Sequence, residues 1–266
     1  MLAAATLSGQ QKVVWSAQEQ PIVDRVFKLR KVPDSERSTA TRELALQIRQ
    51  LPLTTNKLTL ATALASLSTE GDYGRETLQE VATTLSMALK DQPHPEQYME
   101  LAQLVKYEHV TVPPDPQLEA ALSKLEEADR VRQSADFALP DLNGKTWELK
   151  KLQGKVVLVN FWATWCPPCR KEMPDMEALY QRFKDQGLVI LGISDEDASK
   201  VSAYIAAHKV EYPILLDAGR TVNTLFQIEG IPKSFIYDRN GKLAAEAIDM
   251  RTEAQFLDLL RQAGIN

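Results

Sequence analysis

Two cysteines, Cys166 and Cys169, are the residues whose type and spacing most directly suggest chemistry, and the 266-residue chain has no others. An aliphatic stretch at residues 156–159 precedes them and a helical pattern follows, so we expect Cys166 at the start of a helix. There its sulfur faces unpaired backbone N–H groups and the positive end of the helix dipole, which favour the nucleophilic thiolate. Cys169 follows one turn later on the same face and can close a disulfide with Cys166. The spacing therefore predicts a dithiol that cycles with its disulfide.

Other uses of two cysteines fit the sequence less well. A disulfide scaffold would distribute its cysteines along the chain. A structural zinc site needs four ligands, and the three histidines (His94, His109 and His208) form no ligand pair. We therefore expect neither a metal nor another cofactor.

Composition restricts the classes of protein and of partner. Apolar residues make up 44% of the chain and charged residues 25%, as in globular proteins. The net charge of −5, from 31 basic and 36 acidic residues, gives no indication of nucleic-acid binding. Residues 156–159 form the longest purely aliphatic run before the cysteines, far short of the ~20 residues that span a bilayer. Residues 1–9 are apolar but lack a basic stretch, so they are not an intact signal peptide; the trimmed edge of one stays open.

The amino-acid usage changes near residue 134. Only three of the eleven glycines and one of the seven phenylalanines precede it. Residues 1–134 are expected to form an all-α helical domain, because apolar residues recur there at helical spacing. Helix starts near residues 35, 55, 74, 95 and 116 indicate either a helical-repeat array or an irregular bundle. Its role stays open among a scaffold, a partner-binding surface and a dimerisation module.

Residues 135–266 alternate strand and helix signals, which indicates an α/β domain. An Asn-Gly pair at residues 143–144 predicts a first hairpin, and a second Asn-Gly pair at residues 240–241 predicts another. Further strands are expected at residues 156–162, 188–193 and 214–216. Helices are expected at residues 166–184, 198–208, 221–226 and 252–263.

The cysteines lie in the segment Phe-Trp-Ala-Thr-Trp-Cys-Pro-Pro-Cys, residues 161–169. Pro174 follows five residues after Cys169, and Gly230-Ile231-Pro232 comes before the last predicted hairpin. Together these motifs resemble the TlpA/ResA-type thiol–disulfide oxidoreductases of the thioredoxin superfamily, which are grouped with the AhpC/TSA redoxins. The resemblance covers about residues 135–266. It implies a thioredoxin fold, with a central mixed β-sheet flanked by helices, and a cis bond before Pro232 opposite the cysteines.

The same resemblance implies roles for residues around the cysteines. Asn160 stands where ordinary thioredoxin has a buried acid, and Glu172 matches a glutamate that the TlpA/ResA type places close to the pair. A partly buried carboxylate has a raised pKa and can take and return the proton of Cys169. The alternative is an ordinary charge in the first turns of a helix. Substrate contacts are expected from Trp165, Pro167, Pro168, Ile231 and Pro232.

The expected function is that of an enzyme that reduces protein disulfides by dithiol/disulfide exchange. Cys166 attacks the substrate disulfide, and Cys169, deprotonated with help from Glu172, resolves the mixed disulfide. By resemblance, the substrates are extracytoplasmic proteins, such as periplasmic apocytochromes in cytochrome c maturation. An upstream thiol reductant, for example a membrane electron relay, would complete the cycle.

Two other functions are weighed against this one. A peroxiredoxin-like peroxide reductase usually carries its cysteine in a Pro-x-x-x-Thr/Ser-x-x-Cys context, without a second cysteine three residues on. The segment before Cys166 lacks that proline. A partner-binding helical module with an accessory redox domain is the other alternative.

Overall fold

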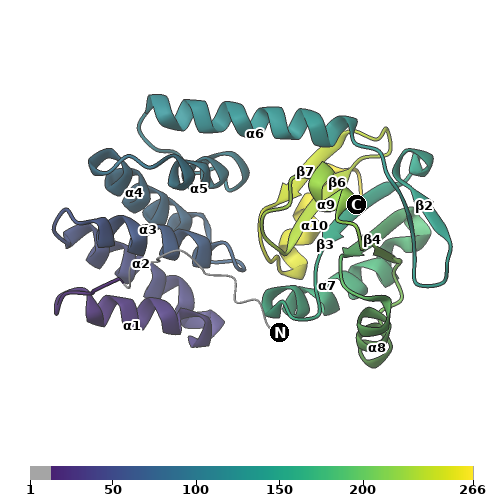
Figure 1. Ribbon diagram of the computed structural model, residues 1–266, viewed down its shortest axis with the longest axis horizontal. Helices are drawn as coiled ribbons and strands as arrows, with labels where there is room; N and C mark the ends of the chain where they lie inside the picture. Colours follow the sequence, from purple (N-terminus) through teal and green to yellow (C-terminus); the bar gives the residue numbers. More distant parts are fainter. Residues whose placement is uncertain (1–12, 266) are drawn as a thin grey trace, which may run out of the picture.

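The computed structural model describes residues 13–265, so the apolar segment at residues 1–9 lies outside the described part of the chain. Within the described residues, helices without strands form the N-terminal half, and a sheet with flanking helices forms the C-terminal half (Figure 1). The predicted change from helices to strands occurs after Ser134. The N-terminal helices are α1 (Gln20–Lys28), α2 (Asp34–Gln50), α3 (Thr55–Ser68), α4 (Arg75–Asp91), α5 (Pro95–Tyr107) and α6 (Pro116–Ser134).

Prolines and a capping carboxylate begin several of these helices. Proline occupies the first turn of α1, α5 and α6, where its missing N–H costs nothing. At α6, Asp115 also accepts hydrogen bonds from the backbone N–H groups of Gln117 and Leu118. Apolar residues from Ile22 to Phe27 follow helical spacing, but Phe27 does not share the buried face of α1. Phe27 is 77% exposed, because the buried stripe continues from Val26 to Leu29 instead.

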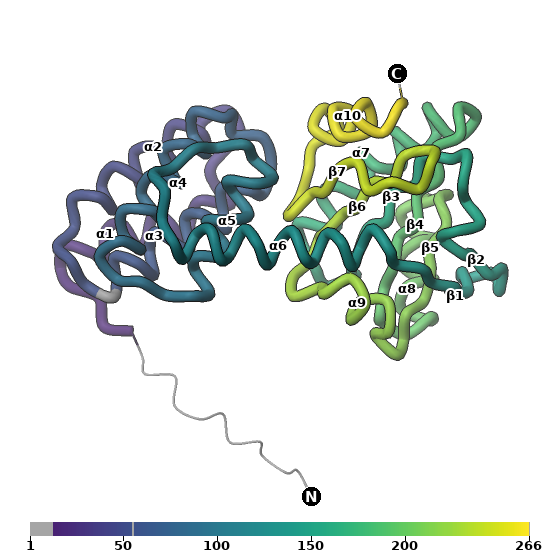
Figure 2. Tube along the Cα trace, turned by 90° about the horizontal axis from the view of Figure 1, so that it is seen from above, coloured from purple at the N-terminus to yellow at the C-terminus, as the bar shows by residue number. Residues whose placement is uncertain are grey.

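A hydrophobic core of its own holds the helical half together. Its fully buried members all lie between Ile22 and Leu125 and come from all six helices and the segments between them. The helix α6 runs from this core to the other half, as Figures 1 and 2 both show. No helix within residues 13–265 is long and apolar enough to cross a membrane.

The C-terminal half is built on two sheets. A small hairpin precedes the main five-stranded sheet, whose strand order is β5-β4-β3-β6-β7. The strands β3, β4 and β5 run parallel, whereas β6 and β7 are antiparallel to their neighbours. The strands are β1 (Ala138–Pro140), β2 (Thr146–Glu148), β3 (Val156–Phe161), β4 (Leu188–Ser194), β5 (Ile214–Leu216), β6 (Lys233–Tyr237) and β7 (Leu243–Ala247). The helices are α7 (Pro167–Phe183), α8 (Ala198–His208), α9 (Thr221–Leu225) and α10 (Glu253–Gln262).

Central strand β3 is buried along its whole length, because helices or loops cover both faces of the sheet. Val156 and Leu158 pack with α7 and α10 in one core, and Val157 and Val159 pack with α9 in another. Asn160 is the next residue on the face of Val156 and Leu158, so its amide points toward α7. This mixed sheet with helices on both faces confirms the fold expected from the resemblance.

The C-terminal end of α6 is fixed to this sheet. Arg132 is buried; its guanidinium pairs with Glu246 of β7 and donates to the carbonyl oxygen of Phe226. The hydroxyl of Tyr237 in turn donates to the backbone carbonyl of Arg132 at 2.8 Å. The connection between the two halves is therefore a continuous helix anchored at both ends.

Candidate functional site

The cysteine pair lies where β3 gives way to α7. Cys166 caps the helix, and the backbone N–H of Cys169 donates to its sulfur at 3.3 Å. The two sulfurs form a disulfide, with the Cα atoms 5.3 Å apart. Cys166 is 2% exposed and Cys169 is fully buried. The local fold thus places the sulfur of Cys166 at a helix N-terminus, where partial positive charge stabilises a thiolate after reduction.

The loop before β6 lies against this disulfide. The peptide bond between Ile231 and Pro232 is cis, as expected. The carbonyl oxygen of Ile231 lies 3.7 Å from the sulfur of Cys166. Segments 65 residues apart in the sequence therefore meet at the reactive sulfur.

The carboxyl group of Glu172 is buried one helical turn after Cys169, on the same face of α7. Its Oε1 accepts a hydrogen bond from the amide of Asn160 at 2.9 Å, and its Oε2 accepts one from the backbone N–H of Arg251 at 3.1 Å. Asn160 also donates to the hydroxyl of Ser234 at 3.0 Å. Burial raises the pKa of Glu172 to about 8, although both hydrogen bonds oppose this change.

The remaining predicted site residues lie around Cys166 and differ in how far they are exposed. Ile231 and Pro232 border the sulfur through the loop just described. Trp165 is 67% exposed beside Cys166. Pro167 is exposed and Pro168 is half-buried in the first turn of α7. These residues form the protein surface around Cys166.

Two residues that no sequence motif indicates hold this site from a distance. Arg251 follows β7, 79 positions after Glu172, and its backbone N–H reaches the carboxylate. Glu196 accepts hydrogen bonds from the backbone and hydroxyl of Thr164, so it fixes the turn before the cysteines. Neither residue belongs to a local motif, and only the tertiary fold brings them to the site.

Comparison with known proteins gives concordant results. The family model of the AhpC/TSA family matches residues 131–246. The thiol-disulfide oxidoreductase ResA of Bacillus anthracis is 35% identical over 132 residues, which are 49% of this chain and 76% of that protein. ResA of Bacillus subtilis (strain 168) is 36% identical over 126 residues, or 47% of this chain and 70% of that protein.

Solved structures also resemble part of the chain. A thiol:disulfide interchange protein of the thioredoxin family from Chlorobium tepidum TLS is 31% identical and has a TM-score of 0.45. The match covers 48% of this chain and 92% of that one.

Proposed function

Since this chain belongs to the ResA family of thiol–disulfide oxidoreductases, we propose that it reduces protein disulfides at Cys166 and Cys169 with Glu172 as proton carrier. The observation that carries this proposal is the disulfide at the N-terminus of α7, with a buried carboxyl group on the same helix face.

The exchange proceeds in two balanced steps. The thiolate of Cys166 attacks one sulfur of the substrate disulfide, which forms a mixed disulfide and releases the other substrate sulfur as a thiolate. Cys169 then loses its proton and attacks the sulfur of Cys166. The Cys166–Cys169 disulfide forms, and the second substrate thiolate leaves. Two electrons have passed to the substrate, and an upstream dithiol then supplies two more to reduce the enzyme again.

Glu172 donates the proton that Cys169 takes up and accepts the proton that Cys169 loses. With a pKa of about 8 in the disulfide form, the carboxyl group holds a proton at pH 7 in roughly nine molecules of ten. When the upstream dithiol opens the disulfide, Glu172 gives this proton to the departing sulfur of Cys169. The resulting carboxylate takes the proton back when Cys169 attacks the next mixed disulfide.

Trp165, Pro167, Pro168, Ile231 and Pro232 form the proposed substrate contacts. The substrates are proteins that carry a disulfide; from the family resemblance we propose an extracytoplasmic location and apocytochromes before haem attachment as substrates. A membrane electron relay is the proposed upstream reductant.

We also propose that residues 1–134 and 135–266 are two domains. Separate hydrophobic cores in the two halves support this division.

The first experiment equilibrates the protein with thiol buffers of defined potential. We expect a reversible two-electron couple between about −270 and −120 mV, the range of known pairs of this fold. A disulfide peptide with the Cys-x-x-Cys-His motif of haem attachment then tests the substrate class. A protein without a reversible couple would not be an oxidoreductase at this pair; a normal couple without peptide reduction would overturn the proposed substrate only.

A further inference from the structure

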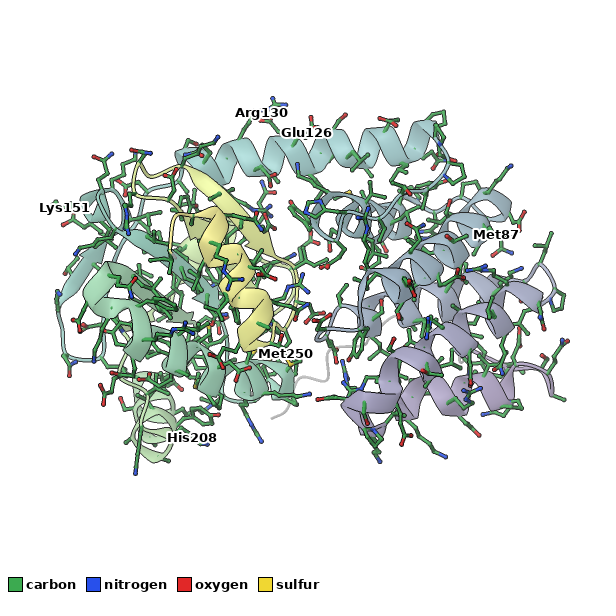
Figure 3. All side chains as sticks on the ribbon, turned by 180° about the vertical axis from the view of Figure 1, so that it is seen from behind. Met87, Glu126, Arg130, Lys151, His208 and Met250 are labelled. Atoms are coloured by element: carbon green, nitrogen blue, oxygen red, sulfur yellow. A yellow bond between two sulfur atoms is a disulfide. The ribbon has the colours of Figure 1, made fainter. Side chains whose placement is uncertain are left out.

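The loop between β7 and α10, residues 248–252, lies between the helical half and the active-site helix. Met250 of this loop, labelled in Figure 3, is buried, and its Cε would lie 3.4 Å from a Cβ placed on Gly71. The hydroxyl of Thr69 donates to the carboxylate of Asp249 at 3.1 Å. The helical half therefore packs directly on the loop that reaches the active site.

Arg251 contacts both the active-site helix α7 and the helical half. Its backbone N–H donates to Glu172, and its guanidinium forms an ion pair with Glu108, the residue that caps the C-terminus of α5. The side chains of Arg251 and Glu108 are only 5% and 9% exposed. Removal of one partner from so buried a pair leaves an uncompensated charge, so the loop must move or rearrange.

We propose that Glu108 and Arg251 are positioning residues for disulfide exchange: their ion pair lets the helical half hold the Arg251 amide against Glu172. This inference rests on the proposed role of Glu172 as proton carrier. It gives the helical half a part in the chemistry. The matched relatives align with about half of this chain, and the AhpC/TSA family model begins only at residue 131, so Glu108 lies outside that model.

Several charged or titratable groups face Glu172 and must be considered in any test by pH. Arg251 and Asp249 come from the loop; Arg251 lowers the pKa of Glu172, and Asp249 raises it. Tyr212, buried before β5, interacts with Glu172 as well. On α7 itself the relevant groups are Cys166 and Cys169, which titrate only in the reduced protein.

The test is a double-mutant cycle between Glu108 and Glu172. The rate of reduction of one disulfide peptide is measured from pH 5 to pH 9 for the wild type, E108Q, E172Q and E108Q/E172Q. We expect E108Q to lower the rate at pH 7 roughly 3- to 10-fold and to move the inflection of the profile, as coupling between residues in one hydrogen-bond and ion-pair network would. In the E172Q background the same substitution should change the rate less than about twofold. An equal loss in both backgrounds would overturn the proposal, because the loss would then not pass through Glu172.

Two further variants keep the result interpretable. E246Q removes the other buried Arg–Glu pair between the helical half and the sheet, which does not touch Glu172; its profile should keep the wild-type inflection. An E246Q profile displaced as far as that of E108Q would point to a general structural effect and refute the inference. If E108Q does not fold, R251K takes its place in the cycle, because lysine keeps the charge and the backbone N–H but loses the fork of the guanidinium. A wild-type profile for E172Q would refute the proton role of Glu172 itself, a separate failure.

Discussion

Replacement of Glu172 by glutamine should change how the stability of the oxidised protein depends on pH. The pKa of Glu172 is raised from 4.5 to about 8 by burial. Between these values the folded protein holds a proton that the unfolded chain has already lost. The stabilisation is therefore complete below the unfolded pKa and is lost as the pH rises toward 8.

The size of the effect follows from the shift. Each pH unit in this window costs the wild type about 1.4 kcal/mol of unfolding free energy, so the whole window amounts to about 5 kcal/mol. Glutamine does not titrate. Between pH 5 and pH 8 the variant should therefore gain about 4 kcal/mol relative to the wild type. Burial also raises the pKa of Glu246 to about 7 and of Asp249 to about 6. Glu246 is present in both proteins and cancels in the comparison, whereas Asp249 interacts with Glu172 and cancels only in part.

Urea unfolding of the oxidised proteins at four pH values measures this difference. Three of the four tryptophans, Trp147, Trp162 and Trp165, lie in the C-terminal half and report on its unfolding by fluorescence. Far-UV circular dichroism serves as a second probe of whether the transition is two-state. Parallel stability curves for wild type and variant would refute the reasoning, since Glu172 would then be ionised in the folded protein throughout.

Three other substitutions test separate parts of the structure. Cys169→Ser should accumulate a mixed disulfide between Cys166 and a substrate peptide, visible by mass spectrometry of the intact protein; accumulation with Cys166→Ser instead would reverse the two roles. Trp165→Ala should change stability by less than about 0.5 kcal/mol, because the ring is exposed. The same variant should lower kcat/KM for a protein disulfide at least threefold and leave the reduction of a small disulfide unchanged. An equal loss of kcat/KM for the protein and the small disulfide would exclude a contact between Trp165 and the protein substrate. Gly192→Ala should destabilise the protein by roughly 1–3 kcal/mol in urea unfolding, because its Cβ would lie 2.8 Å from Cδ1 of Ile214. A neutral result would mean that the side chain of Ile214 moves aside at little cost.

Much of the fold could be predicted because local rules determine it. Proline and a capping aspartate mark the start of α6, and the Asn-Gly pair at residues 143–144 lies in the turn between paired β1 and β2. The exposed ring of Phe27 shows the limit of periodicity: it is adjacent to the buried Val26, about 100° around the helix, and only the packing of neighbouring helices decides which side is covered.

The cysteines and the Ile231–Pro232 loop could be identified from motifs, whereas the environment of Glu172 could not. Burial raises its pKa and the backbone N–H of Arg251 lowers it, and both effects come from segments that are distant in the sequence. The pairing of Arg251 with Glu108 joins residues 143 positions apart, and no spacing or composition encodes such a contact. The sequence thus indicates candidate residues for the chemistry, while the tertiary fold determines how strongly their protons are held.

Because α6 is one continuous helix, its length sets how one half of the protein is rotated relative to the other. Its 19 residues extend about 28 Å at 1.5 Å per residue, and each residue adds about 100° of rotation. A single residue inserted in the middle of α6 would thus turn one half against the other by more than a quarter of a circle and draw Glu108 away from Arg251. An insertion of seven residues, about two full turns, would nearly restore the rotation but separate the halves by about 10 Å. The number of residues in this helix therefore determines whether Glu108 can reach Arg251 at the redox site.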